Sequence, residues 1–268
     1  MAQLLLRGQP LGHFEGVLFD KDGTLSHSEP RLIEQGHSRI EAACQCFRAE
    51  QQHREGHSIE QVTLLRAQLH QAYGLIEGGV SPDGLLAVAS RQHNLVSTAT
   101  VFSLMGLAWP KALRLAEESF IQAAEARRAI QAGGNEHPSP LLAGAATMLD
   151  QLRAARVTCA VISNDTKAGI SAFLRAHHLE AHMAAIWSAD DRPSKPSPAA
   201  VEQLCRQLNL QPSRCVLIGD ADSDLLMARQ AGIGLSLGYT AGWATTPGLN
   251  EQHHLIHHWG ELNVAPSP

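Results

Sequence analysis

Three short apolar runs, each followed within two residues by a polar side chain, place the strongest constraint on the fold of this chain. The runs are Gly16–Phe19, Val157–Ile162 and Cys215–Ile218. They are rich in β-branched residues and continuous rather than alternating, which is typical of strands buried on both faces of a parallel sheet. The chain is therefore expected to build one parallel sheet from segments that lie far apart in the sequence.

Helical patterns separate these strands in the second half of the chain. Apolar positions recur at helical spacing in Ile170–His177 and in Pro198–Leu208, and a further helix is expected around Asp224–Ala231. A fourth strand is expected at Ile233–Leu237. Alternating strands and helices predict an α/β fold, with a doubly wound, Rossmann-like parallel sheet as its core.

The stretch after Leu25 differs in composition and in the spacing of its apolar residues. It is rich in Ala, Gln, Glu, Leu and Arg with helix-like periods, and it has almost no β-branched runs. Turn-forming residues are expected to divide it into about four helices, at Gly56, at Gly78–Gly79 with Pro82–Gly84, and at Pro110. We therefore predict an α/β core from residues 1–25 and 139–268, with an all-α cap domain inserted at residues 26–138.

Polar residues follow three of the predicted strands at the point where each strand ends. GVLFD places Asp20 there, VISND places Ser163 and Asn164, and VLIGD places Asp220. Ligands of open α/β sheets bind at the carboxyl ends of the strands, which meet at one edge of the sheet. The sequence therefore predicts a functional site at this edge.

Four separated motifs in a fixed order resemble those of the haloacid-dehalogenase-like hydrolases. They are DKDGT, the strand-end Ser163, Lys195 in SKPSP, and GDADSD. Any one of them alone is weak evidence, but the ordered set spans nearly the whole predicted core. The resemblance implies a hydrolase that acts through a carboxylate nucleophile.

This resemblance implies a role for each matching acid. Asp20 would attack phosphorus and form an aspartyl-phosphate, while Asp22 would act as general acid and base. Mg²⁺ would lie between the nucleophile and the anionic phosphate, since this hard ion prefers oxygen ligands. Its ligands would be Asp20, the main-chain carbonyl of Asp22, Asp220 and Asp224.

The phosphoryl group needs fixed hydrogen-bond donors and positive charge. The resemblance supplies a hydroxyl from Ser163, a backbone amide from Asn164 and an ammonium from Lys195. Gly23 would let the backbone close around the phosphate, and Thr24 would bind there or satisfy a turn or a carboxylate. These five residues complete the predicted phosphate site.

Asp22 indicates the type of reaction, and the insertion indicates the class of substrate. Dehalogenating members of the family lack an acid two residues after the nucleophile, so Asp22 favours phosphate esters as substrates. Helical-cap members usually act on small phosphorylated metabolites, and the motifs KPSPAA and LIHHWGEL most resemble phosphoglycolate phosphatase. The expected activity is therefore that of a Mg²⁺-dependent phosphatase, with 2-phosphoglycolate as the substrate hypothesis. A phosphomutase like β-phosphoglucomutase and a catalytically silent binding protein remain the alternatives.

Several other polar residues are weaker candidates. Asp165, Asp190 and Asp191 are less expected as metal ligands, because acids at such turns usually cap helices. The crowded histidines are expected to lie at the surface or on a strand edge, outside the site: His253, His254, His257 and His258. His27, at the hinge into the insertion, is expected at the surface, with contact to the substrate as the alternative. Which residue of the insertion would reach a second anionic group of a substrate is left open among Arg31, Arg39, Arg66 and Lys111.

Composition bears mainly on partners and location. A formal net charge of -5 disfavours nucleic acid as a partner, because binding its backbone needs a concentrated basic surface. No apolar run approaches the roughly 20 residues that span a membrane. The five cysteines form no CxxC pair, which fits a reducing compartment. We expect a cytoplasmic monomer or homodimer that binds a small phosphorylated metabolite and no membrane.

Overall fold

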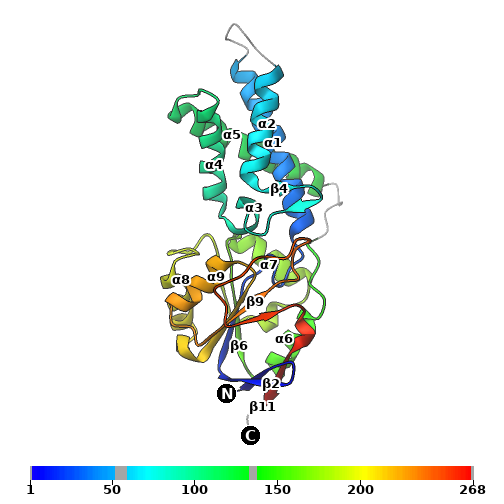
Figure 1. Cartoon of the computed structure of the whole chain (residues 1–268), viewed down its shortest axis with the longest axis vertical. Coiled ribbons are helices and arrows are strands. Elements are labelled where there is room, and N and C mark those ends of the chain that lie inside the picture. Colours follow the sequence, from blue (N-terminus) through cyan, green and yellow to red (C-terminus); the bar gives the residue numbers. More distant parts are fainter. Residues whose placement is uncertain (1, 52–58, 133–137, 267–268) are drawn as a thin grey trace. The chain divides into compact units, whose positions relative to one another are not determined.

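The computed structural model describes residues 2–51, 59–132 and 138–266 (Figure 1). The chain divides into two compact units. One combines Met1–Glu29 with Pro138–Pro268, and the other is Pro30–His137. We call the first the sheet unit and the second the helical unit.

A six-stranded parallel sheet forms the centre of the sheet unit, in the order β10-β9-β8-β3-β6-β7. Its strands are β3 (Gly16–Phe19), β6 (Thr158–Ile162), β7 (Ala185–Trp187), β8 (Cys215–Gly219), β9 (Leu235–Tyr239) and β10 (His254–Ile256). In this register Phe19 of β3 is paired with Val161 on one side and Ile218 on the other. The α/β fold class and the parallel sheet are confirmed.

Helices cover both faces of this sheet because successive side chains of a strand point to opposite faces. The helices are α6 (Ala145–Ala154), α7 (Lys167–Ala176), α8 (Pro198–Gln207) and α9 (Asp222–Gln230). Val17 and Phe19 pack into a core with residues of α6 and α7. Leu18, between them in β3, packs into a second core with residues of α8 and α9. The central strand is thus buried on both faces, as its continuous apolar run predicts.

A second, antiparallel sheet was not predicted. It has the order β11-β1-β2 and consists of β1 (Ala2–Leu6), β2 (Gln9–Phe14) and β11 (Leu262–Pro266). The segment LIHHWGEL, expected as one short strand, instead divides among β10, the 3-10 turn η3 (Trp259–Glu261) and β11. Trp259 explains the break, since its ring is buried against Phe19 and Tyr239 of the sheet.

The inserted segment is helical, as predicted, but it is not all-α. Its helices are α1 (Glu29–Gln51), α2 (Ile59–Tyr73), α3 (Leu85–Val88), α4 (Arg91–Leu104) and α5 (Trp109–Ala132). Strands β4 (Leu75–Ile76) and β5 (Gly79–Val80) form a small hairpin, turned by Gly78 with φ +73°. Pro110 lies in the first turn of α5, where proline is well tolerated. The predicted break at Gly56 lies outside the described residues.

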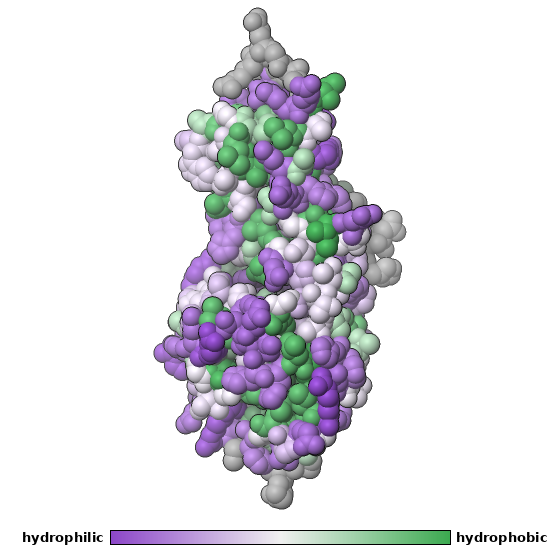
Figure 2. Space-filling model, in the orientation of Figure 1, coloured by the Kyte–Doolittle hydropathy of each residue, from purple (hydrophilic) through white to green (hydrophobic). Residues whose placement is uncertain are grey.

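The helices, the surface and the cysteines relate to the expectations about membrane association and a reducing compartment. In the described part of the chain, no helix is both long and apolar enough to cross a membrane. On the face drawn in Figure 2, hydrophilic and hydrophobic residues are interspersed. All five cysteines are buried free thiols.

Candidate functional site

Three buried carboxylates meet at the carboxyl edge of the parallel sheet. Asp20 follows β3, Asp220 follows β8, and Asp224 lies in the first turn of α9. Each offers an oxygen within 4.8 Å of the others. The backbone N–H of Asp20 donates to the carbonyl of Ile218 at 2.9 Å, which extends the β3–β8 pairing to the first of these acids.

Lys195 is the cation buried among these acids. Its Nζ lies 2.6 Å from Asp20 Oδ1 and 2.7 Å from Asp224 Oδ1, and it also donates to the carbonyl of Ile162 at 3.3 Å. Burial works to lower the pKa of Lys195, but the charges of Asp20 and Asp224 raise it above its ordinary value. Lys195 therefore stays protonated and holds two of the three carboxylates in place.

One ammonium does not balance three carboxylates. The pKa of Asp20 is raised to about 6, mainly by burial and in part by the charges of Asp224 and Asp22, in spite of Lys195. The pKa of Asp220 is also well above its ordinary value, because of burial and the charges of Asp20 and Asp224. A buried set of oxygen ligands with an excess of negative charge fits a divalent cation such as Mg²⁺.

The loop after Asp20 closes tightly on Asp220. Gly23 has φ +77°, and a Cβ at this position would collide with the Asp220 carboxylate and the Trp243 indole. Thr24 Oγ1 donates to Asp220 Oδ1 at 2.9 Å, and Trp243 Nε1 donates to Oδ2 at 2.6 Å. The Thr24 hydroxyl thus contacts a carboxylate, one of the expectations for this residue. Trp243, which sequence reasoning missed, fixes the other oxygen of Asp220.

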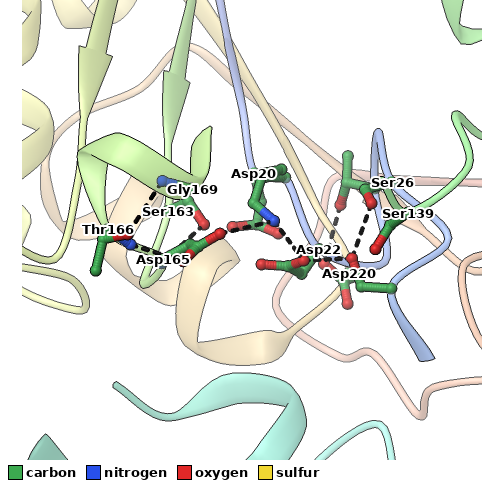
Figure 3. A network of polar contacts seen from close by, with 12 residues as sticks. Asp20, Asp22, Ser26, Ser139, Ser163, Asp165, Thr166, Gly169 and Asp220 are labelled. Atoms are coloured by element: carbon green, nitrogen blue, oxygen red, sulfur yellow. Dashed lines mark hydrogen bonds and ion pairs between the residues drawn. The ribbon is translucent and has the colours of Figure 1, made fainter. Parts of the chain in front are cut away.

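Asp22 belongs to a second polar group beside these acids (Figure 3). Its Oδ1 accepts from Lys21 Nζ at 2.6 Å and from the hydroxyl of Ser28. Lys21 is only 2 % exposed, and its Nζ also lies 3.1 Å from Asp165 Oδ2. Lys21 therefore connects the loop after β3 to the loop before α7. Neither Lys21 nor Ser28 was predicted; the only signal was a lysine enclosed between two acids in DKDGT.

Ser163 lies where predicted, directly after β6, whose neighbour in the sheet is β3, the strand before Asp20 (Figure 3). It is buried, and its Oγ accepts from the N–H of Asp165 at 3.2 Å. Asn164 follows it and is half-buried. Helix α7 begins at Lys167, after Thr166, whose hydroxyl accepts from the N–H of Gly169 at 3.1 Å. The structure thus places a hydroxyl and a helix N-terminus beside the acids.

Sequence comparison identifies the family to which this arrangement belongs. Residues 14–232 match the haloacid dehalogenase-like hydrolase family. The chain belongs to this family. The haloacid dehalogenase-like assignment covers β3, β6 and β8 and therefore all three acids.

Curated relatives within reach of sequence comparison are phosphoglycolate phosphatases. Those of Vibrio vulnificus (strain CMCP6) and Psychrobacter arcticus are 30 % and 31 % identical over 98 residues. These alignments span 35 % of this chain and 43 % of the relatives, which is less than half of their length.

Solved structures of similar fold cover most of the chain. One is described as a predicted phosphoglycolate phosphatase from Haemophilus somnus, with TM-score 0.62 and 16 % identity over 94 % of this chain and 97 % of its own. Another is a HAD-superfamily hydrolase of subfamily IA from Geobacter sulfurreducens, with TM-score 0.50 and 16 % identity over 93 % and 95 %. At these identities the likeness concerns the fold.

The other acids of this haloacid dehalogenase-like chain have local roles. Asp190 Oδ2 accepts from the N–H of Lys167 at 2.9 Å, at the start of α7. Asp191 Oδ2 accepts from the N–H and the hydroxyl of Ser188 at 2.8 and 2.7 Å. Among the described residues, the potential metal-binding group consists of Asp20, Asp220 and Asp224 and includes none of the acids at these turns.

The crowded histidines contact separate partners in the sheet unit. His253 Nδ1 accepts from the N–H of Ser236 at 3.0 Å, and His257 Nδ1 lies 2.7 Å from Thr240 Oγ1. His258 lies 3.6 Å from Glu261, and His254 is exposed. The backbone N–H of His27 donates to the carbonyl of Pro140 at 2.8 Å.

Mg²⁺ is expected to raise the melting temperature of the protein, on the order of 5 °C and more at about pH 8 than at about pH 5. Because the pKa of Asp20 rises from 3.8 to about 6 on folding, the stability that neutral Asp20 contributes is complete below about pH 4 and lost as pH rises through about 6. A divalent cation offsets that loss by neutralising the ionised acids. Thermal unfolding with Mg²⁺ or EDTA at both pH values measures this, and equal shifts at the two pH values would contradict it.

Proposed function

We propose that this haloacid dehalogenase-like hydrolase is a Mg²⁺-dependent phosphatase that hydrolyses a small phosphate monoester through Asp20. The observation that carries the proposal is the buried group of Asp20, Asp220 and Asp224 around Lys195 at the strand ends. Asp22 supports phosphate-ester chemistry over carbon–halogen cleavage, because an alcohol leaving group needs a proton and a halide does not.

In the first step an Asp20 oxygen attacks phosphorus, and the bond from phosphorus to the leaving oxygen breaks. Asp22 gives its proton to that oxygen, so that a neutral alcohol leaves. Lys195 keeps Asp20 in one orientation through its bonds to Asp20 and Asp224. Mg²⁺ would be held by Asp20, Asp220, Asp224 and the main-chain carbonyl of Asp22. Its charge would reduce the electrostatic repulsion between the Asp20 carboxylate and the phosphate.

In the second step a water attacks phosphorus and loses a proton to Asp22. The bond between phosphorus and Asp20 then breaks, which releases inorganic phosphate and restores both acids to their starting state. The Ser163 hydroxyl, the Asn164 amide and the backbone at Gly23 would donate to the phosphoryl oxygens during both steps. In this proposal Thr24 acts on the phosphate site through Asp220, to which its hydroxyl donates.

The substrate proposed is a small phosphorylated metabolite, with 2-phosphoglycolate as the first compound to test. The similarity to curated phosphoglycolate phosphatases over 98 residues supports this choice. We propose that residues 26–138 act as a cap domain on a core of residues 1–25 and 139–268. A reducing, cytoplasmic location is proposed with it, since all five cysteines are free thiols. The oligomeric state proposed is a monomer or homodimer.

Phosphate release from p-nitrophenyl phosphate and from a panel of phosphorylated metabolites tests the proposal. Release is expected to need Mg²⁺, and 2-phosphoglycolate is expected to have the highest kcat/KM. Hexose phosphates that exceed it tenfold, about 1.4 kcal/mol of transition-state stabilisation, would exclude the substrate hypothesis. Transfer of the phosphoryl group to a sugar without phosphate release would instead indicate a phosphomutase. Tight ligand binding without turnover would indicate a catalytically silent binding protein.

A further inference from the structure

Two arginines of the helical unit lie over one aromatic ring. The guanidinium carbon of Arg39 in α1 lies 4.4 Å from the ring centroid of Phe120 in α5. That of Arg91, the first residue of α4, lies 5.3 Å from the same centroid. Because an aromatic ring face attracts cations, Phe120 stabilises both guanidinium groups.

Arg39 is buried and precisely fixed. It is 7 % exposed, and its Nη1 donates to Oδ1 of Asn94 at 3.1 Å. The amide nitrogen of Asn94 in turn donates to the carbonyls of Leu85, Ala89 and Ser90 at 3.2, 3.3 and 3.0 Å. These hydrogen bonds fix the orientation of the Asn94 amide, so an uncharged partner holds Arg39 in place.

The charge of this pair is not balanced by the protein. Within the described residues, neither Arg39 nor Arg91 forms an ion pair with a carboxylate, whereas Arg66 pairs with Glu41 and Arg114 with Glu118. The pKa of Arg39 is lowered to about 10, mainly by burial and in part by the positive charges of Arg91, Arg127 and Arg31, against an opposing effect of Tyr73. A buried guanidinium among other cations is costly unless an anion joins it.

The free donors of Arg39 are accessible. Its Nε and Nη2 have no acceptor among the described residues, yet neither is among the fully enclosed side-chain atoms that lack a partner. Arg91 is exposed. Arg91 thus offers an exposed guanidinium group, and Arg39 offers one that Asn94 already holds in place.

We propose that Arg39 and Arg91 form a binding site for a carboxylate or phosphate group of a small molecule. Planar guanidinium groups match both anions through paired N–H bonds. The anion we propose is a free carboxylate or phosphate that acts as an effector, and both of its ligands lie within the helical unit.

The first arm of the experiment compares kcat/KM for 2-phosphoglycolate with kcat/KM for p-nitrophenyl phosphate, and it rests on the proposed function. For a free effector, Arg91→Gln and Arg39→Lys should leave the ratio of the two constants unchanged. A roughly tenfold lower ratio in both variants, with no change in Arg114→Gln, whose arginine pairs with Glu118, would assign the site to a charged group of the substrate and overturn the effector.

The second arm measures malonate binding by calorimetry and uses no substrate. Arg91→Gln should weaken malonate binding roughly tenfold, while Arg114→Gln should not change it. Weaker malonate binding with an unchanged substrate ratio assigns the site to a free effector. Unchanged malonate binding together with an unchanged ratio overturns the proposal. If the wild type releases no phosphate from either ester, the proposed function fails, and malonate binding alone decides on the anion site.

Discussion

Asp20→Asn is expected to lower kcat for phosphate release by about four orders of magnitude or more, with Mg²⁺ and p-nitrophenyl phosphate. The amide is a poor nucleophile and does not form the aspartyl-phosphate. Substrate binding should fall much less, because Ser163, Asn164 and Lys195 remain. Initial rates of p-nitrophenol and phosphate release measure the effect.

Stability separates this loss of activity from a folding defect. Ionised Asp20 is destabilised by burial and by Asp224 and Asp22, as its pKa of about 6 indicates. Asp20→Asn removes that charge, so the metal-free variant should unfold at or above the wild-type temperature at about pH 8. Asp150→Asn is the matched control, since this exposed acid contacts only His182 at 2.8 Å among the contacts described for it, and it should keep wild-type activity. A retained activity above about one per cent of wild type in Asp20→Asn would show that Asp20 is not the phosphoryl acceptor.

The parallel sheet was predictable because the apolar composition of its strands indicates that they are buried. The runs that became β3, β6 and β8 are apolar on both faces, and only a strand covered on both faces accepts such a sequence. The sheet of β1, β2 and β11 had no comparable signal. Strand β2 contains Pro10 and Gly12, which disfavour strands locally, and β1 pairs with a segment at the other end of the chain. Such a sheet is stabilised by tertiary pairing rather than by local preference.

The candidate site was predictable where motifs mark strand ends, and not where loops meet. Asp20, Asp220 and Asp224 converge because their strands and helix share one edge of the sheet. Trp243 donates to Asp220, which lies 23 residues away in the sequence. Its indole packs closely against Gly23, which has a positive φ and no Cβ that would collide with the ring. No periodicity encodes that contact. A further unpredicted bond joins Glu29 Oε2 to the N–H of Ala244 at 2.7 Å.

Asp22→Asn is expected to lower kcat for an alkyl phosphate by about two to four orders of magnitude, and that for p-nitrophenyl phosphate by less. The alkoxide leaving group needs a proton in the transition state, whereas p-nitrophenolate leaves readily without one. The loss in kcat for the alkyl ester is therefore set by a slowed first step, and the loss in kcat for the aryl ester mainly by the second. Steady-state kinetics with 2-phosphoglycolate and p-nitrophenyl phosphate provide the comparison.

With the aryl ester, the first step of Asp22→Asn should outrun the second, so phosphorylated protein should accumulate. Intact mass measured after acid quenching detects it, together with a burst of p-nitrophenol equal to the amount of protein. Ser28→Ala is the matched control: it removes one hydrogen bond to Asp22 but keeps the carboxylate and its contact with Lys21 at 2.6 Å. Its loss should stay below about tenfold for both esters. Equal losses for the two esters in Asp22→Asn, without phosphorylated protein, would mean that Asp22 positions the loop after β3 and transfers no proton.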